Sequence, residues 1–144
     1  MFLSDGLSVA FLLFIQKLKF MIARVTATDK GLALIERLKV LHGPLMFHQS
    51  GGCCDGSQPM CFNAGEFIVG SSDVWMGTIS DCKFYMGKDQ FEYWKHTQLI
   101  LDVTPGRGSS FSLEIPLGVR FFIQSKIFTE IELEELEPLM EIPN

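Results

Sequence analysis

One strong helical pattern, followed only by short apolar segments, constrains the fold of this chain more than any other feature. Thr28 is a favourable N-cap residue, and apolar side chains recur after it at helical spacing as far as Gly43, a residue type that commonly follows a helix end. The pattern therefore predicts one main helix over residues 28–42. The apolar residues that set the period are Leu32, Ile35, Leu38 and Leu41.

The segments around this helix have the length and composition of strands. Alternating or continuous apolar residues predict short strands over residues 22–25 and 44–47, a hairpin of 97–103 with 111–115, and a long last strand over 119–128. An α+β fold follows, mostly antiparallel, with one main N-terminal helix packed on the sheet. Further strands are predicted over residues 66–69, 74–79 and 83–85, the first two joined by the turn 70–73, and one or two helical turns over 88–95.

Length and composition indicate a single domain. The chain has 144 residues, of which 47% are hydrophobic, and this is enough for a well-packed core. We predict a globular domain over residues 21–128, followed by an acidic tail or short helix over 129–144. Residues 1–20 are predicted to be an N-terminal extension, in keeping with a misplaced start codon. The alternatives for that segment are a peripheral membrane anchor and an extra helix, since its apolar run is too short to span a bilayer and lacks the charge order of a signal peptide.

Charge and cysteine content narrow the function classes. The formal net charge is −5 and no basic stripe is present, which argues against a nucleic-acid partner. Four cysteines in a chain of this length are too few for a disulfide scaffold, so a reducing, cytoplasmic setting is predicted, with no membrane partner.

The segment 48–61, which reads HQSGGCCDGSQPMC, gathers three of the four cysteines and one of the three histidines. Its glycines and its proline allow the tight turns that would bring those side chains together. Thiolate and imidazole groups are the ligands that zinc, iron and iron–sulfur clusters prefer. The segment therefore predicts a transition-metal or cluster site formed by Cys53, Cys54, Cys61 and His48.

Other interpretations of these cysteines remain open. The spacing differs from the paired C-x2-C pattern of zinc ribbons, and buried thiols often behave as small hydrophobic residues with no chemistry. Cys53 and Cys54 could instead act as a nucleophile or redox pair, with His48 as the base for Cys53. Cys82, just before a predicted strand, is predicted to be a core residue rather than a fourth ligand.

Several longer motifs resemble a bacterial family known only as domain-of-unknown-function family seven-seven-nine. The motifs are LHGPLMFHQSGGCCDGS at 41–57, QFEYWKHTQL at 90–99, PGRG at 105–108 and FSLE at 111–114. The resemblance runs from about residue 21 to residue 128 and implies no established activity. Genes of this family often lie beside aldehyde or alcohol dehydrogenase genes, so the resemblance implies a dehydrogenase as a metabolic partner.

The order of helix, strand, Gly-Gly-Cys motif, strands and hairpin is also similar to the HesB-like A-type iron–sulfur carriers. This similarity implies a small β-sandwich or pseudo-barrel in which Cys53 is the first ligand. The carriers' C-terminal Cys-Gly-Cys pair has no counterpart, because residues 118–128 contain no cysteine. The two resemblances together imply a metal- or iron–sulfur-binding accessory or carrier protein that acts with an enzyme such as an aldehyde dehydrogenase. The alternative is a thiol-based enzyme or redox sensor that uses Cys53 and Cys54.

Overall fold

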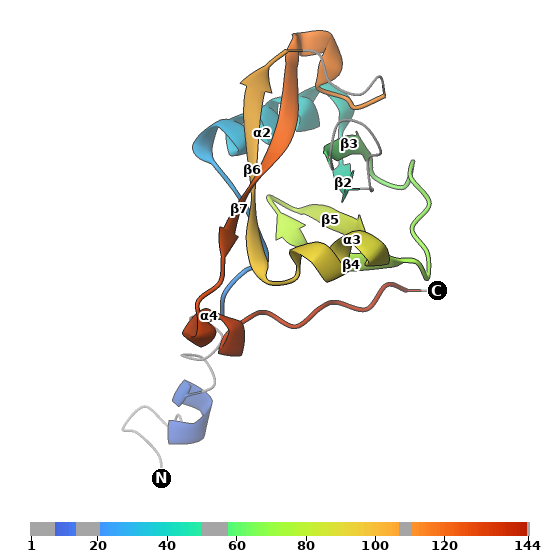
Figure 1. Ribbon diagram of the computed structural model, residues 1–144. Coiled ribbons are helices and arrows are strands. Elements are labelled where there is room, and N and C mark those ends of the chain that lie inside the picture. Colours follow the sequence, from blue (N-terminus) through green and yellow to red (C-terminus); the bar gives the residue numbers. More distant parts are fainter. Residues whose placement is uncertain (1–7, 14–20, 50–57, 107–110, 144) are drawn as a thin grey trace.

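Two β-sheets and one main helix enclose a common core in the computed structural model, which describes residues 8–13, 21–49, 58–106 and 111–143 (Figure 1). One sheet has the strand order β1-β6-β7 and the other the order β3-β2-β5-β4. The elements are β1 (Val25–Ala27), α2 (Asp29–His42), β2 (Leu45–Gln49), β3 (Pro59–Asn63), β4 (Asp73–Ile79), β5 (Cys82–Gly87), α3 (Lys88–Trp94), β6 (Thr97–Pro105), η1 (Ile115–Leu117), β7 (Val119–Ile127) and α4 (Glu130–Glu134).

The predicted α+β class, with mostly antiparallel pairing, is confirmed. Strands β2 and β3, β4 and β5, and β6 and β7 pair antiparallel, whereas β1 pairs with β6, and β2 with β5, in parallel. In the described part of the chain the two sheets are separate and do not close into a barrel. The predicted helical turns over 88–95 are also confirmed, as α3.

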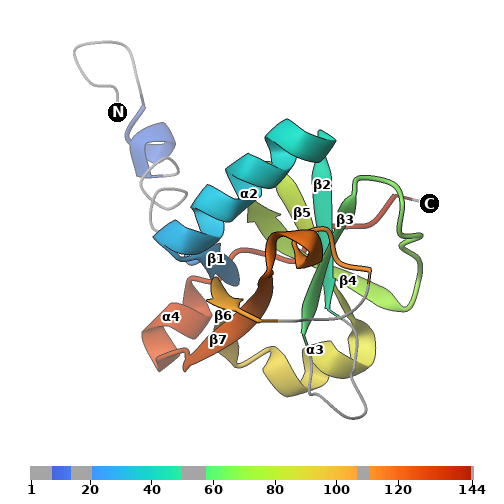
Figure 2. The same ribbon diagram turned by 90° about the horizontal axis from the view of Figure 1, so that it is seen from above.

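The main helix forms where its local signals place it. The Thr28 hydroxyl accepts a hydrogen bond from the Gly31 N–H at 3.1 Å, and Gly43 ends the helix with a φ of 82°. The helix lies along one side of the two sheets (Figure 2) and contacts β1, β2 and β6. It buries Leu34, Ile35 and Leu38, so the predicted helix is confirmed. Of the four residues that set its period, Leu32 and Leu41 are exposed, and the inward face is only partly the predicted one.

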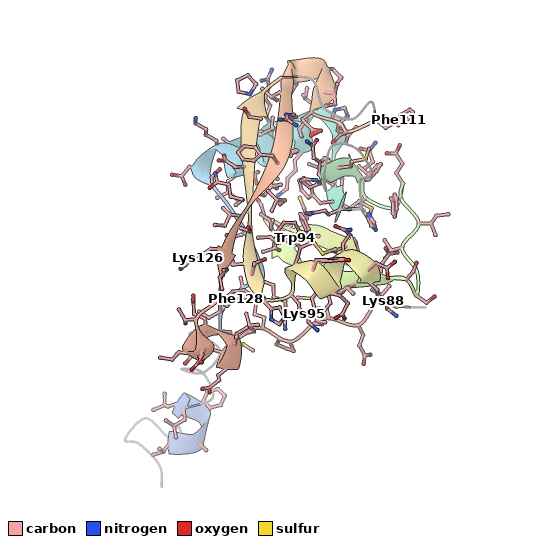
Figure 3. All side chains as sticks on the ribbon, viewed as in Figure 1. Lys88, Trp94, Lys95, Phe111, Lys126 and Phe128 are labelled. Atoms are coloured by element: carbon pink, nitrogen blue, oxygen red, sulfur yellow. The ribbon has the colours of Figure 1, made fainter. Side chains whose placement is uncertain are left out.

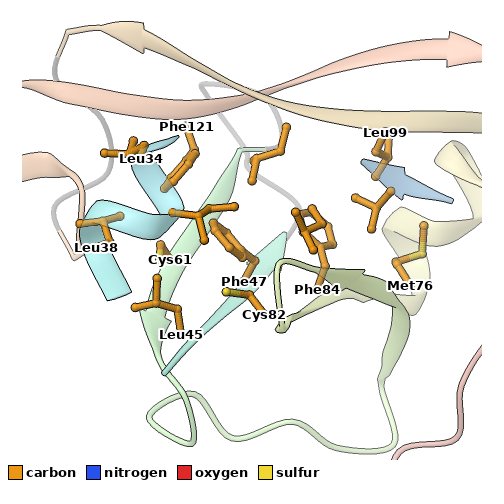
Figure 4. Packing of buried hydrophobic residues seen from close by; sticks show 14 of the residues in the cluster. Leu34, Leu38, Leu45, Phe47, Cys61, Met76, Cys82, Phe84, Leu99 and Phe121 are labelled. Atoms are coloured by element: carbon orange, nitrogen blue, oxygen red, sulfur yellow. The ribbon is translucent and has the colours of Figure 1, made fainter. Parts of the chain in front are cut away.

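Aromatic rings from both sheets fill the centre of the core (Figure 4). Phe47 of β2 is fully buried, with its ring stacked at 6.0 Å on Phe84 of β5 and edge-on at 5.1 Å to Phe121 of β7. Side chains alternate along a strand, so the next residue, His48, points to the outer face of the four-stranded sheet. Adjacent residues of β2 therefore serve the core and the opposite surface.

The strand predicted over residues 66–69 is wrong. Gly65 has a φ of 86°, and the Glu66 carboxylate accepts a hydrogen bond from the Asn63 N–H, so the chain turns here instead of pairing. The following residue, Phe67, stacks its ring on His48 at a centroid distance of 4.2 Å. Phe67 thus covers the outer face of the sheet, whereas Ile68 is exposed to solvent.

The hairpin predicted between 97–103 and 111–115 is also wrong, because β6 pairs with β7. Phe111 is 79% exposed (Figure 3), whereas Ser112 and Glu114 are buried. The Cys61 N–H donates to the Ser112 hydroxyl at 2.8 Å, and that hydroxyl donates to the Glu114 carboxylate at 2.9 Å. Polar bonds to β3 and β7 therefore decide the path of this segment.

The C-terminal segment folds against the domain. Thr129 and Glu132 form a capping box that starts α4, which is the short helix foreseen for residues 129–144. Beyond it the chain returns to Ile22, whose N–H donates to the Glu135 carbonyl at 2.8 Å. Residues 9–13 are helical, while the rest of the predicted N-terminal extension, residues 1–7 and 14–20, lies outside the described residues. No helix in the described ranges has the length and apolarity needed to cross a membrane.

Candidate functional site

The sheet topology brings several chain segments together at one end of the four-stranded sheet. Because β2 and β5 run parallel, their last residues lie at the same end, where Gln49 faces Met86. Strand β4 runs antiparallel to β5 and begins there, with Asp73 opposite Gly87. Strand β3 also begins there, with Pro59 opposite Gln49. Both attachment points of the predicted cysteine segment are thus at this end.

A buried imidazole and a carboxylate meet at this end of the sheet. His48 Nε2 lies 2.7 Å from Asp73 Oδ1, and only 5% of the His48 side chain and 10% of the Asp73 side chain are exposed. The other carboxylate oxygen, Oδ2, accepts a hydrogen bond from the Gly70 N–H at 3.0 Å. The turn 70–73 therefore holds the carboxylate in place, while Phe67 packs on the imidazole ring.

A cavity of about 640 Å³ opens beside this pair. Its wall joins the turn before β4 to the start of α3, and the Lys88 N–H donates to the Ser72 carbonyl at 2.9 Å between them. The volume suits a small ligand, and most of the lining residues are of polar type. These are His48, Ser71, Ser72, Asp73, Gly87, Lys88, Asp89 and Gln90.

Cys61 lies on the opposite side of the sheet from this cavity. In the register of β2 with β3, Phe47 faces Cys61 whereas His48 faces Met60, so Cys61 points into the core. Burial raises the pKa of its thiol, and the nearby Glu114 and Cys82 raise it further. The structure therefore does not bring together the two predicted ligands that it describes, Cys61 and His48.

The other predicted ligands, Cys53 and Cys54, lie outside the described residues, so the metal site stays a prediction. Within the part of the chain that the structure describes, no three His, Cys, Asp or Glu residues are grouped as metal ligands. Cys82 is buried in the core, the position predicted for it.

We expect Cys61 and Cys82 to resist alkylation in the folded protein. Both side chains are buried, and burial raises the pKa of each thiol, so little reactive thiolate forms at neutral pH. Mass spectrometry after iodoacetamide treatment should find both unmodified in native protein and modified in urea. Rapid native modification of Cys61 would contradict its placement in the core.

Comparison with known protein families finds a match for this chain. A family model described as Domain of unknown function (DUF779) matches residues 34–127, which is more than half of the chain. The chain belongs to this family. The DUF779 match contains the whole site described above, from His48 to Gln90. No curated protein matches the chain.

Asp73 is the site residue that sequence reasoning missed. It is 25 positions from His48 within the DUF779 match, and no local spacing links the two. The available signal was the turn 70–73, which was predicted and which ends in a carboxylate at the start of a strand. Only the sheet order shows that this turn lies beside the end of β2.

Proposed function

We propose that this protein binds a transition metal or iron–sulfur centre at the end of β2 and serves as an accessory or carrier protein. The observation that supports this proposal is the hydrogen bond between His48 and Asp73. Imidazole ligands of metals commonly have one ring nitrogen bonded to a carboxylate, which orients the ring and raises its basicity. In a neutral His48 ring, donation of the Nε2 proton to Asp73 puts the lone pair on Nδ1.

The ligands that we propose are His48, Cys53 and Cys54. The two cysteines follow the last residue of β2, Gln49, by four and five positions. Cys61 is left out because its side chain faces the core on the other side of β2. A mixed set of imidazole and thiolates suits zinc and iron–sulfur centres, and the choice between them is open to measurement.

Metal content after anaerobic purification tests the proposal. We expect about one equivalent of metal, or one cluster, per wild-type chain, and a loss of it in the Cys53→Ser/Cys54→Ser variant. Asp73→Asn should weaken the affinity about 10- to 100-fold, because the imidazole loses its orienting carboxylate. His48→Gln should lower the metal content, whereas the matched control His42→Gln, at an exposed histidine of α2, should not.

Equal metal content in wild type, His48→Gln and the double cysteine variant would contradict the proposal. Circular dichroism of each variant shows whether a loss of metal reflects unfolding instead. A wild-type protein that holds no metal after anaerobic purification and reconstitution with zinc or iron would exclude the metal-binding function.

The hydrogen bond between His48 and Asp73 also supports a second candidate function. A thiol-based enzyme or redox sensor needs a cysteine activated by a histidine that a third group orients, and Asp73 could orient His48 in this way. Under this alternative the protein contains no metal and one cysteine of the 53–54 pair alkylates rapidly. His48→Gln should then slow that alkylation, and His42→Gln should leave it unchanged.

The accessory role rests on the family resemblance and its gene neighbourhood. We propose that the partner is a cytoplasmic aldehyde or alcohol dehydrogenase. The acidic net charge and the lack of a basic stripe in the sequence make a nucleic-acid partner a poorer choice. Purified, metal-loaded protein should bind such a dehydrogenase or change the activity of the dehydrogenase. The Cys53→Ser/Cys54→Ser variant should do neither.

A further inference from the structure

The outer edge of β7 carries backbone groups that form no hydrogen bond within the described residues. In the part of the chain that the structure describes, β7 pairs with β6 alone and is the last strand of its sheet. In an antiparallel pair, successive residues of a strand point their backbone groups alternately toward the partner strand and away from it. The Phe128 N–H bonds to the His96 carbonyl, so the backbone groups of Phe122, Gln124 and Lys126 also point toward β6. The N–H and C=O groups of Ile123, Ser125 and Ile127 therefore point away from the sheet.

The exposure of the side chains agrees with an uncovered edge. Residues 124–127 are exposed one after another, so neither face of the strand is covered along this stretch. Ile127 is 76% exposed, so its apolar side chain is open to solvent at the end of the strand. Lys126 lies at the outer margin of the ribbon that β6 and β7 form (Figure 3).

The uncovered edge has two definite ends. At one end the Phe121 N–H points outward but is already bonded to the buried Glu114 carboxylate, at 3.4 Å. At the other end β7 finishes at Ile127, and the chain turns at Thr129 into α4. The usable edge therefore runs from Ile123 to Ile127, with Ser125 at its centre.

We propose that this edge joins a second copy of the chain by antiparallel pairing about a two-fold axis at Ser125. In that register Ile123 of each copy faces Ile127 of the other, and Ser125 faces Ser125. All the outward backbone groups of the two edges then meet, which gives about six N–H···O=C bonds and one continuous six-stranded sheet.

The side chains fit the same register. Two Ile–Ile cross-strand pairs form on one face, and Gln124 of one copy faces Lys126 of the other on the opposite face, so no like charges face each other. If one copy shifted by one residue, its outward N–H and C=O groups would face backbone groups of the other copy that already bond to β6. A five-residue edge is small, so we expect a weak, reversible dimer rather than an obligate one.

Sedimentation velocity of the full chain, from about 1 μM to about 1 mM, tests the proposal. We expect concentration-dependent dimer formation that Ser125→Pro weakens at least about tenfold. Proline at 125 removes an outward N–H and no bond to β6, so the monomer should keep its fold. Ile127→Lys should also weaken the dimer, whereas Val40→Lys, at a residue of α2 that is 87% exposed, should not.

Hydrogen–deuterium exchange of the amides of residues 123–127 locates the interface. In the wild type these amides should exchange more slowly as the concentration rises through the dimerisation range, and those of Ser125→Pro should not change. A protein that stays monomeric at about 1 mM would overturn the proposal. A dimer that leaves exchange at 123–127 unchanged, or that Ser125→Pro and Ile127→Lys both leave intact, would overturn it as well.

Discussion

Phe47→Ala is expected to destabilise the protein by about 3–5 kcal/mol, the largest effect among the substitutions considered. The ring is fully buried where the two sheets meet, between Phe84 of one sheet and Phe121 of the other. Its removal leaves a cavity that both aromatic neighbours line, and β2 is central in its sheet and cannot easily close over it. Urea unfolding followed by circular dichroism should show this loss as a lower midpoint with a similar slope.

Phe111→Ala supplies the matched control, because Phe111 is the same residue type but is 79% exposed. We expect its effect to stay within about 0.5 kcal/mol. A loss of less than about 1 kcal/mol in Phe47→Ala would show that this ring does not fill the core between the sheets.

The neighbouring residue in β2 should behave differently. His48 faces the outer side of the sheet, so its replacement by glutamine removes a hydrogen bond to Asp73 but opens no cavity between the sheets. Under the proposed function, stability and metal binding are separable at adjacent positions of one strand. The test is to measure urea unfolding and metal content for both Phe47→Ala and His48→Gln.

The elements that could be predicted from the sequence are those with local signals. The helix α2 has its cap, its period and its terminating glycine within 16 residues, so its prediction needed no knowledge of the rest of the fold. The strands β6 and β7 are long and apolar enough to be recognised alone. These three elements were therefore predicted with nearly correct limits. The short strand predicted over residues 22–25 was not, because it shares only Val25 with β1.

The pairing of strands could not be predicted in the same way. The segment 111–115 has apolar alternation, but Ser112 and Glu114 turn inward because their partners, the N–H groups of Cys61 and Phe121, lie in β3 and β7. Strand β3 was missed because the glycine-rich sequence before it suggested that the loop continues through Cys61. The first error concerns partners that are distant in sequence, whereas the second comes from a misleading local signal, because β3 pairs with β2, the strand just before it.

In the candidate site, too, the sequence revealed the residue with a local motif but not its partner from another strand. His48 was singled out from the motif that contains it, whereas Asp73 became visible only once β5 was found between β2 and β4. Cys61 was predicted to lie in the site, but its side chain is on the core side of β3. A shift of one residue in a strand moves a side chain to the other face, and the sequence gives no direct measure of that register.

Gly31→Ala is expected to destabilise the protein by about 1–3 kcal/mol, against the usual direction for this change in a helix. Alanine in place of a helical glycine normally stabilises by about 0.5–1 kcal/mol. Here the added Cβ would lie 2.7 Å from the backbone carbonyl oxygen of Leu101, closer than a carbon and an oxygen can approach. That carbonyl accepts a hydrogen bond from the Thr28 N–H at 2.9 Å, so it cannot move away without weakening the start of the helix.

The clash must be relieved by a shift of α2 away from β6, and such a shift loosens the contacts of Leu34 and Ile35 with the core. Thermal unfolding should therefore give a lower Tm for Gly31→Ala than for wild type. The control is Ala33→Gly, at an exposed position of the same helix, which should lose only the propensity difference of about 0.5–1 kcal/mol. A higher Tm in Gly31→Ala would mean that α2 and β6 do not approach this closely, because only that contact opposes the gain from alanine.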